Sequence, residues 1–98
     1  MTQLLKSEAL VLHSIRWRES SKILQLFTAE RGLLKVIARG ALRPKSSLRG
    51  ILENLNHVEI VIGIKETREL QLVSQAEMIN PFSHIREDLE STAVAYAI

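Results

Sequence analysis

The stretch KILQLFTAERGLLKVIAR, residues 22–39, discriminates between a helical and a β fold for this chain. Its first part, residues 22–30, fits two interpretations. Ile23, Leu24 and Phe27 fall on one face of a helix, and the same residues also fit a strand that is buried on both faces. Residue propensity alone does not separate these two interpretations.

The second part, residues 33–39, alternates in the way a strand does. The even positions are apolar, and Lys35, Ile37 and Arg39 share the other face. Between the two parts stands the sequence ERG, whose Gly32 is free to take the positive φ of a tight turn. A strand after a tight turn favours a strand before it, so residues 22–39 are predicted to form a β-hairpin.

Three further segments are predicted to be strands, residues 8–15, 57–64 and 70–79; the first is short and apolar, and residues 57–64 are largely β-branched. The chain thus has five strands, with one long gap between the third and the fourth. In this gap, residues 40–50, glycine and proline make regular structure unlikely before Ser46. The apolar spacing over residues 48–55 predicts a short helical turn at the end of this gap.

The last segment, residues 81–98, has the character of a helix. Pro81 stands near its start, and Ile85 and Leu89 lie on one apolar face that we expect to turn inward. The segment ends in AVAYAI without a stop signal. We therefore expect a nucleic-acid-binding domain in residues 1–80, followed in 81–98 by the first helix of a truncated helical domain.

Composition excludes several classes of protein and disfavours others. The 98 residues contain no cysteine, which rules out disulfides and thiolate zinc sites. No apolar run approaches the roughly 20 residues of a membrane span, and the N-terminus lacks a signal-peptide pattern. His13, His57 and His84 lack metal-ligand spacing, and no P-loop or nucleophile elbow is present. We expect a chain with no catalytic residue, no metal and no cofactor.

The charge distribution is uneven, although the net charge is only +2. Residues 31–52 carry six basic side chains and no acidic one, whereas residues 53–98 carry three basic and eight acidic side chains. Most of the basic middle falls in the loop-like sequence ARGALRPKSSLRG, residues 38–50. Such a cluster points to an anionic partner, and an ordinary solvated surface is the alternative.

A short barrel would bring the first loop, the second and third strands and the basic loop near one another. Several cations in a row, with glycines that allow close approach, suit a phosphate backbone. Trp17 either stacks on a base or folds back over the edge of the core, and Phe27 is expected in the core rather than as a stacking platform. The candidate nucleic-acid-binding residues are Arg16, Trp17, Arg18, Lys22, Lys35, Arg39, Arg43, Lys45 and Arg49.

The sequence RESSKILQLFTAERGLLKVIARGALRPKSSLRGIL closely resembles the N-terminal region of the RecO family of bacterial DNA repair and recombination mediators. EALVLHSI before it and QLVSQAEMINPFSHIREDLE after it resemble the same family. The resemblance implies a mainly β fold, a five-stranded Greek-key OB-fold barrel followed by the start of a C-terminal helix. It also implies that residues 22–30 are a strand.

The resemblance further implies a non-catalytic module that binds single- and double-stranded DNA through the phosphate backbone. It implies that the protein anneals complementary strands and acts together with RecR. It also implies that the protein helps to load RecA onto DNA coated with single-strand-binding protein. The expected location is the bacterial cytoplasm, at the nucleoid and not at a membrane. Leu42 departs from the family, whose members often carry a basic residue there. Two alternatives remain: a basic barrel that docks an acidic partner tail, and an RNA-binding OB domain.

Overall fold

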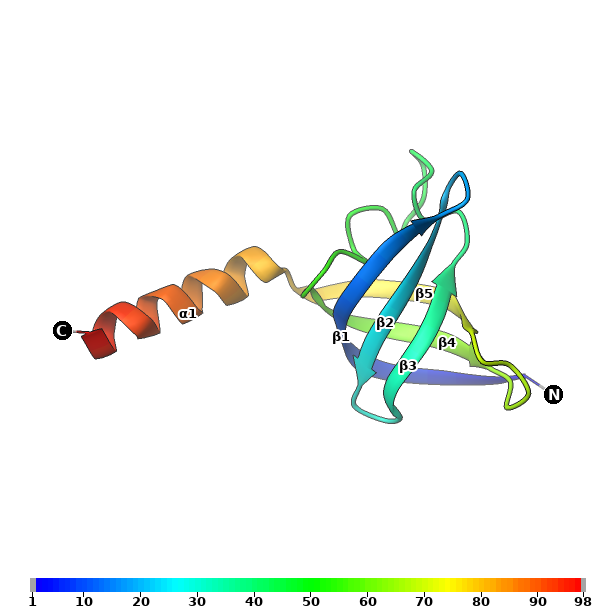
Figure 1. Cartoon of the computed structure of the whole chain (residues 1–98), viewed down its shortest axis with the longest axis horizontal. Helices are drawn as coiled ribbons and strands as arrows, with labels where there is room; N and C mark the ends of the chain where they lie inside the picture. The colour runs from blue at the N-terminus through cyan, green and yellow to red at the C-terminus, as the bar shows by residue number, and fades with distance from the viewer. Residues whose placement is uncertain (1, 98) are drawn as a thin grey trace.

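The computed structural model describes the backbone of residues 2–97 and the side chains of residues 2–84 and 87–91. Five strands precede one helix along the chain (Figure 1). The elements are β1 (Gln3–Trp17), β2 (Ser21–Thr28), β3 (Gly32–Ala38), β4 (His57–Ile64), β5 (Gln71–Asn80) and α1 (Phe82–Ala97).

The five strands close into a barrel in the order β1-β2-β3-β5-β4, with β4 returning to β1. Neighbouring strands are antiparallel except β3 and β5, which run parallel and pair only at Val36–Gln71 and Ile37–Leu72. This Greek-key order is that of an OB-fold. The predicted fold class, a mainly β five-stranded OB-fold barrel followed by a helix, is confirmed.

Strand β1 is long enough to pair with two neighbouring strands. Its first half pairs with β4 and its second half with β2, and a bulge between Val11 and His13 lies where the strand passes from one to the other. Bulges bend a strand and increase its twist, which closes the barrel here. The predicted strand 8–15 is therefore the middle of a strand that runs from Gln3 to Trp17.

The β2–β3 hairpin confirms the strand interpretation of residues 22–30, and Gly32 takes a φ of +67° in its turn. Even-numbered side chains of β2 point inward and odd-numbered ones outward. Phe27 is odd-numbered and 54% exposed, so its expected place in the core is wrong. The expectation rested on apolar character, whereas the two-residue period of a strand puts Phe27 on the same outer face as Ile23.

Inward side chains of all five strands fill the barrel, and the long loop between β3 and β4 closes one end of it. From this loop, Ala41 and Leu52 are fully buried in the core. The predicted helical turn over residues 48–55 is wrong, since this stretch contains only turns. Gly50 and Leu55 both have positive φ, which a right-handed helix does not allow.

Helix α1 leads away from the barrel (Figure 1). Leu89 is 64% exposed, so its predicted inward orientation is wrong in this structure. The side chain of Ile85 lies outside the described residues. In the part of the chain that the structure describes, no helix is long and apolar enough to span a membrane.

Candidate nucleic-acid interface

Two loops meet at one end of the barrel and build the candidate site. They are the β1–β2 loop, residues 18–20, and the first part of the β3–β4 loop, from residue 39 onward. The backbone N–H of Leu42 donates to the carbonyl of Ser20 at 2.8 Å, and that of Gly40 donates to Ser21 Oγ at 3.4 Å. These bonds hold loops that are about 20 residues apart in sequence side by side, as the antiparallel β2–β3 pairing requires.

Basic side chains from both loops converge on two adjoining hollows of about 420 and 400 Å³. The hollows share Arg39, Gly40 and Arg43. Arg18, with Trp17, lines the first hollow and Lys45 lines the second. We call Arg18, Arg39, Arg43 and Lys45 the basic end. The predicted proximity of the first loop and the basic loop therefore holds in the structure.

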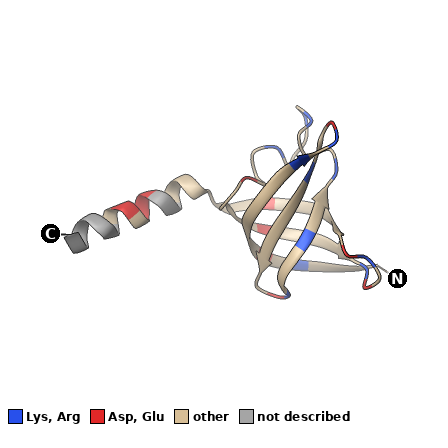
Figure 2. Ribbon diagram, in the orientation of Figure 1, with Lys and Arg blue, Asp and Glu red and all other residues tan. Residues whose placement is uncertain are grey.

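The basic end takes part in none of the ion pairs of the described residues. Those ion pairs join Lys6–Glu59, Lys22–Glu53, Arg31–Glu66 and His57–Glu8. Blue loops cluster at the top of the barrel in Figure 2. Glu19 is the acidic residue of the β1–β2 loop, so the four cations of the basic end keep a net positive charge that attracts an external anion.

Gly40 lets the basic loop turn tightly at the base of this cluster. Its φ of +68° lies in the left-handed region, and the Arg43 side chain packs about 3.5 Å from where a Cβ would stand. Two other candidate arginines shape the loops. Arg16 Nη2 donates to the carbonyl of Glu19 at 2.7 Å, and Arg49 Nη1 donates to that of Leu42 at 3.3 Å. Both remain exposed, so each guanidinium has further donors to offer.

Trp17 stands at the edge of the first hollow and is 42% exposed. The guanidinium of Arg18 lies 5.8 Å from the centre of its ring, a cation–π distance. Arg18 itself has a φ of +58°, which turns its side chain back over the indole. The ring is thus held by a cation and still partly open to solvent.

The two candidate lysines on the strands differ. Lys35 is exposed on the outer face of β3, opposite Gln25 of β2. Lys22 is 8% exposed and points into the barrel end, where Nζ donates to the carbonyl of Leu52 at 2.9 Å and lies 3.4 Å from Glu53 Oε2. The structure therefore brings the other eight candidates to the surface and gives Lys22 a partner inside the protein.

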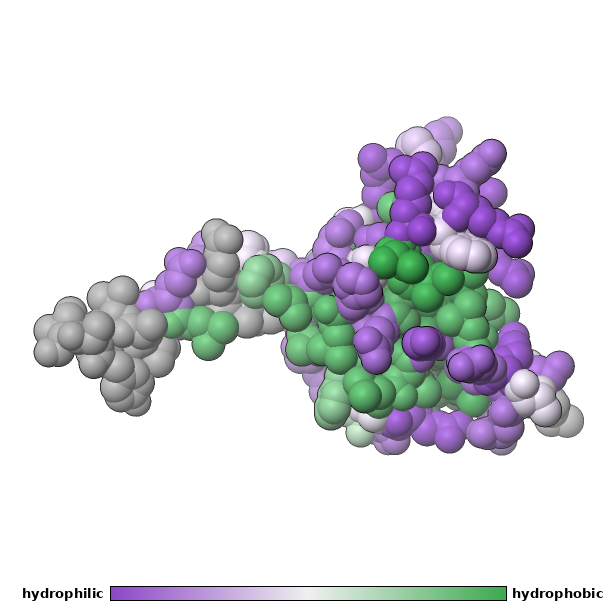
Figure 3. All heavy atoms as spheres, in the orientation of Figure 1, coloured by the Kyte–Doolittle hydropathy of each residue, from purple (hydrophilic) through white to green (hydrophobic). Residues whose placement is uncertain are grey.

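Sequence reasoning missed the apolar part of this surface. Ile15, Phe27 and Leu33 are exposed on the outer face of β1, β2 and β3, below the basic end. In Figure 3 the green surface lies on this face beneath the purple loops. Hydrophobicity gave no signal for this surface, because apolar residues occupy both faces of the hairpin.

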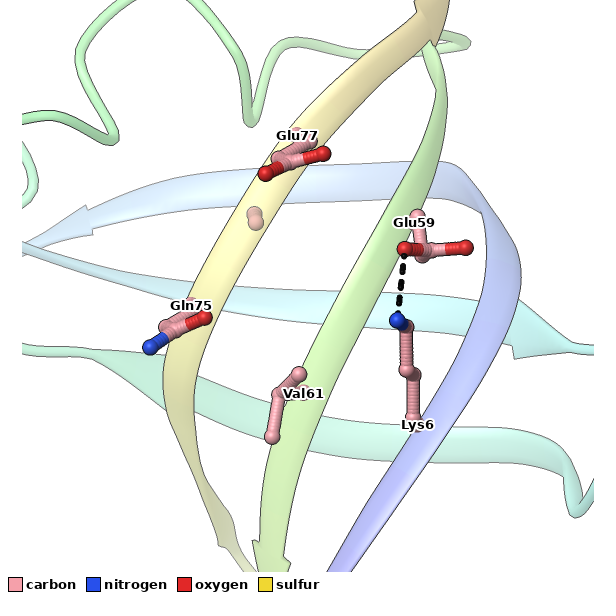
Figure 4. A pocket seen from close by; sticks show the side chains of 6 residues that line it. Lys6, Glu59, Val61, Gln75 and Glu77 are labelled. Carbon is pink, nitrogen blue, oxygen red and sulfur yellow. Dashed lines mark ion pairs between the residues drawn. The ribbon is translucent and has the colours of Figure 1, made fainter.

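A row of acidic side chains runs across three strands of the barrel, away from the basic end. Glu8, Glu59 and Glu77 lie in register across β1, β4 and β5. Lys6 Nζ lies 3.3 Å from Glu59 in the shallow pocket shown in Figure 4. No three potential metal ligands come together among the described residues. Positive and negative charge are thus segregated to different faces of one small barrel.

The topology and the basic end define an OB-fold domain with a cationic loop cluster at one end. The family model described as recombination protein O N terminal matches residues 1–82. This chain therefore belongs to the RecO family.

Individual relatives agree with this assignment. The DNA repair protein RecO of Chlorobium phaeobacteroides is 42% identical, and that of Salinibacter ruber is 38% identical, each over 97% of this chain and 36% of the relative. That of Desulforamulus reducens is 38% identical over 93% of this chain and 35% of the relative. The chain spans about a third of the length of these curated relatives.

Proposed function

We propose that this barrel is a non-catalytic DNA-binding module that acts in DNA repair. The single observation that carries the proposal is the basic end, where two loops bring four cations to adjoining hollows. Family membership supports the repair role, since the relatives are named DNA repair proteins. Phosphates would lie on the basic end, and Trp17 beside it would stack on a base.

The contacts follow from the chemistry of the side chains. Arginine binds phosphate through two donors at once, and lysine binds it as a point charge, so a mixed cluster adapts to a flexible backbone. Such contacts carry no base information, and the basic end would therefore hold single- and double-stranded DNA alike. Arg16, Arg49 and Lys35 would extend the contact around the rim and down β3.

We further propose the setting in which this module works. In the longer protein it supports strand annealing and, with RecR, the loading of RecA onto DNA coated with single-strand-binding protein. This places it in the bacterial cytoplasm at the nucleoid. In that protein residues 1–80 form the DNA-binding domain, and residues 81–98 begin the helical domain.

A salt titration of DNA binding tests the proposal. Single-stranded binding changes by about 0.7 of a unit in log–log slope for each phosphate neutralised. Arg43→Ala and Lys45→Ala should each weaken binding to all sequences equally and make the slope shallower by just under one unit. Lys65→Ala is the matched control, because this exposed lysine lies on the β4–β5 loop, away from the basic end. Unchanged affinity and slope in both loop variants would contradict the proposal.

Competition separates DNA from the other anions that a basic cluster attracts. Labelled single-stranded DNA bound to the protein is challenged with unlabelled DNA, RNA of the same sequence and an acidic peptide. Displacement by DNA at the lowest concentration is the expected result. Stronger displacement by RNA or by the peptide would favour an RNA-binding domain or a docking site for an acidic partner tail.

A further inference from the structure

The outer face of β1, β2 and β3 carries side chains in rows that run across the strands below the basic end. Each row is set by strand pairing, and neighbouring rows are two residues apart along β2. From the basic end downward the rows are Trp17–Ser21, Ile15–Ile23–Ile37, His13–Gln25–Lys35 and Leu10–Phe27–Leu33.

The apolar and basic side chains of these rows indicate the chemistry of a ligand that would bind them. None of the side chains in these rows is acidic, and Glu8, which borders the lowest row, is paired with His57 at 3.2 Å. Apolar rows alternate with a row that contains Lys35. A ligand that offers flat apolar groups and negative charges at short intervals fits this order, and an unpaired nucleic-acid strand is such a ligand.

The lowest row has the form of a stacking platform. Phe27 is 54% exposed and Leu33, directly opposite it on β3, is 59% exposed. A hollow of about 230 Å³ opens beside the ring, and its other lining residues are Glu8, Ala9, Leu10, Ala29 and His57. The core does not use the ring, because inward Leu24 and Leu26 fill the barrel at this level. An exposed aromatic ring among aliphatic side chains is costly to leave in water unless something covers it.

The platform also lies at a suitable distance from Trp17. Ser21, which pairs with Trp17, and Phe27 are six residues apart on β2, which is about 20 Å in a strand. An OB-fold covers roughly four or more nucleotides of a single strand. Lys35 lies in the row between the platform and the isoleucines, where it would meet the backbone of a strand on this path.

We infer that Phe27, together with Leu33, is a second base-stacking position, reached by a single strand that runs from the basic end down this face past Lys35. The inference rests on the proposed function. A duplex keeps its bases stacked inside the helix, so Phe27 contacts single strands only. The basic end then sets affinity for both forms of DNA, and Phe27 sets the preference for the single-stranded form.

The test compares Phe27→Ala with the unchanged chain on oligo(dT) of about 12 nucleotides and on a duplex of the same length. Loss of one stacked base should weaken single-strand binding by roughly 10-fold and leave duplex binding unchanged. The salt slope should stay the same, because no phosphate contact is lost. Phe27→Tyr should restore binding. Leu4→Ala is the matched control, since this exposed leucine of β1 pairs with Gly63 of β4 and lies off the face.

A second measurement reports contact directly. Trp17 is the only tryptophan, so Trp17→Phe combined with Phe27→Trp moves the sole indole to the platform. Its fluorescence should be quenched by oligo(dT) and not by the duplex. Quenching by both, or by neither at saturating DNA, would overturn the inference.

The outcomes separate this inference from the proposed function. If Arg43→Ala weakens binding while Phe27→Ala changes neither form, the inference is wrong and the proposed function stands. If Phe27→Ala weakens both forms equally, the ring does not select single strands, and the inference is again wrong. If Arg43→Ala and Lys45→Ala change nothing, the proposed function itself fails.

Discussion

Lys22 is the candidate residue whose environment differs most from what its charge suggests. Its ammonium group is buried at the end of the barrel and bonded to the carbonyl of Leu52. A charged group in such a place needs a partner, and the partly exposed Glu53 supplies the counter-charge. Lys22 therefore ties β2 to the far end of the β3–β4 loop.

Lys22→Met should destabilise the barrel by roughly 1–3 kcal/mol, because it leaves the Leu52 carbonyl without its donor. Urea unfolding measures this change. The salt slope of DNA binding should not change in the folded variant. Lys35→Ala, in contrast, should leave stability within about 0.5 kcal/mol, since this side chain is exposed. A stable Lys22→Met protein with a shallower salt slope would show that Lys22 contacts DNA after all.

Residue orientation was the part of β2 that hydrophobicity could not predict. The sequence KILQLFT has apolar residues at both odd and even positions, so neither face is marked as the interior. The register of the hairpin and the barrel closure decide it, and they put Lys22 inside and Phe27 outside. A strand whose two faces both look buried is one in which the outer face can serve a ligand.

At the scale of elements, the β3–β4 loop is the main departure from the predicted pattern. The apolar residues of its segment 48–55 have the spacing of a helix, yet the segment forms short separate turns. In one of them the Ile51 N–H donates to the Leu48 carbonyl. Packing explains why this segment forms separate turns and not a helix, because the side chain of Leu52 is buried at the end of the barrel. The strands were predictable because alternation and turn residues agree, whereas the loop is shaped by contacts distant in sequence.

Leu52→Ala should be among the most destabilising changes in the loop. Leu52 is 1% exposed in the core, and removing a buried leucine side chain costs about 2–5 kcal/mol. Leu55→Ala is the control, because Leu55 is an exposed loop leucine close by. Thermal or urea unfolding of both variants gives the comparison. Equal, small effects would mean that the loop does not close the barrel.

The acidic row across β1, β4 and β5 gives a further expectation. Glu77 stands directly opposite Glu59, and like charges in such cross-strand pairs are destabilising. Glu77→Gln should therefore stabilise the barrel by about 0.2–1 kcal/mol at low salt, with the gain shrinking as salt is added. Unfolding at two ionic strengths measures it. A loss of stability on neutralising Glu77 would show that its carboxylate has a favourable partner.

At the scale of the whole molecule, the basic end and the acidic row lie on different parts of the barrel. The cations predicted from sequence do gather at one end, since hairpin topology brings the two loops together. The acidic residues of β4 and β5 lie elsewhere on the barrel, which sequence order alone could not place. A DNA strand would thus be attracted to the loops and to the face of β1–β3 and repelled from the face of β4 and β5.

Helix α1 should be dispensable for this binding. A chain that ends at Ser83 keeps the bond from the Phe82 N–H to Asn56 Oδ1, the contact by which the start of α1 is joined to the barrel. Every residue of the basic end lies on barrel loops, so the shortened chain should retain its melting temperature, DNA affinity and salt slope. Thermal unfolding and fluorescence anisotropy check the three quantities. A shortened chain that is folded and binds DNA more weakly would place part of the interface on α1, and one that unfolds would show that residues 1–80 are not a domain on their own.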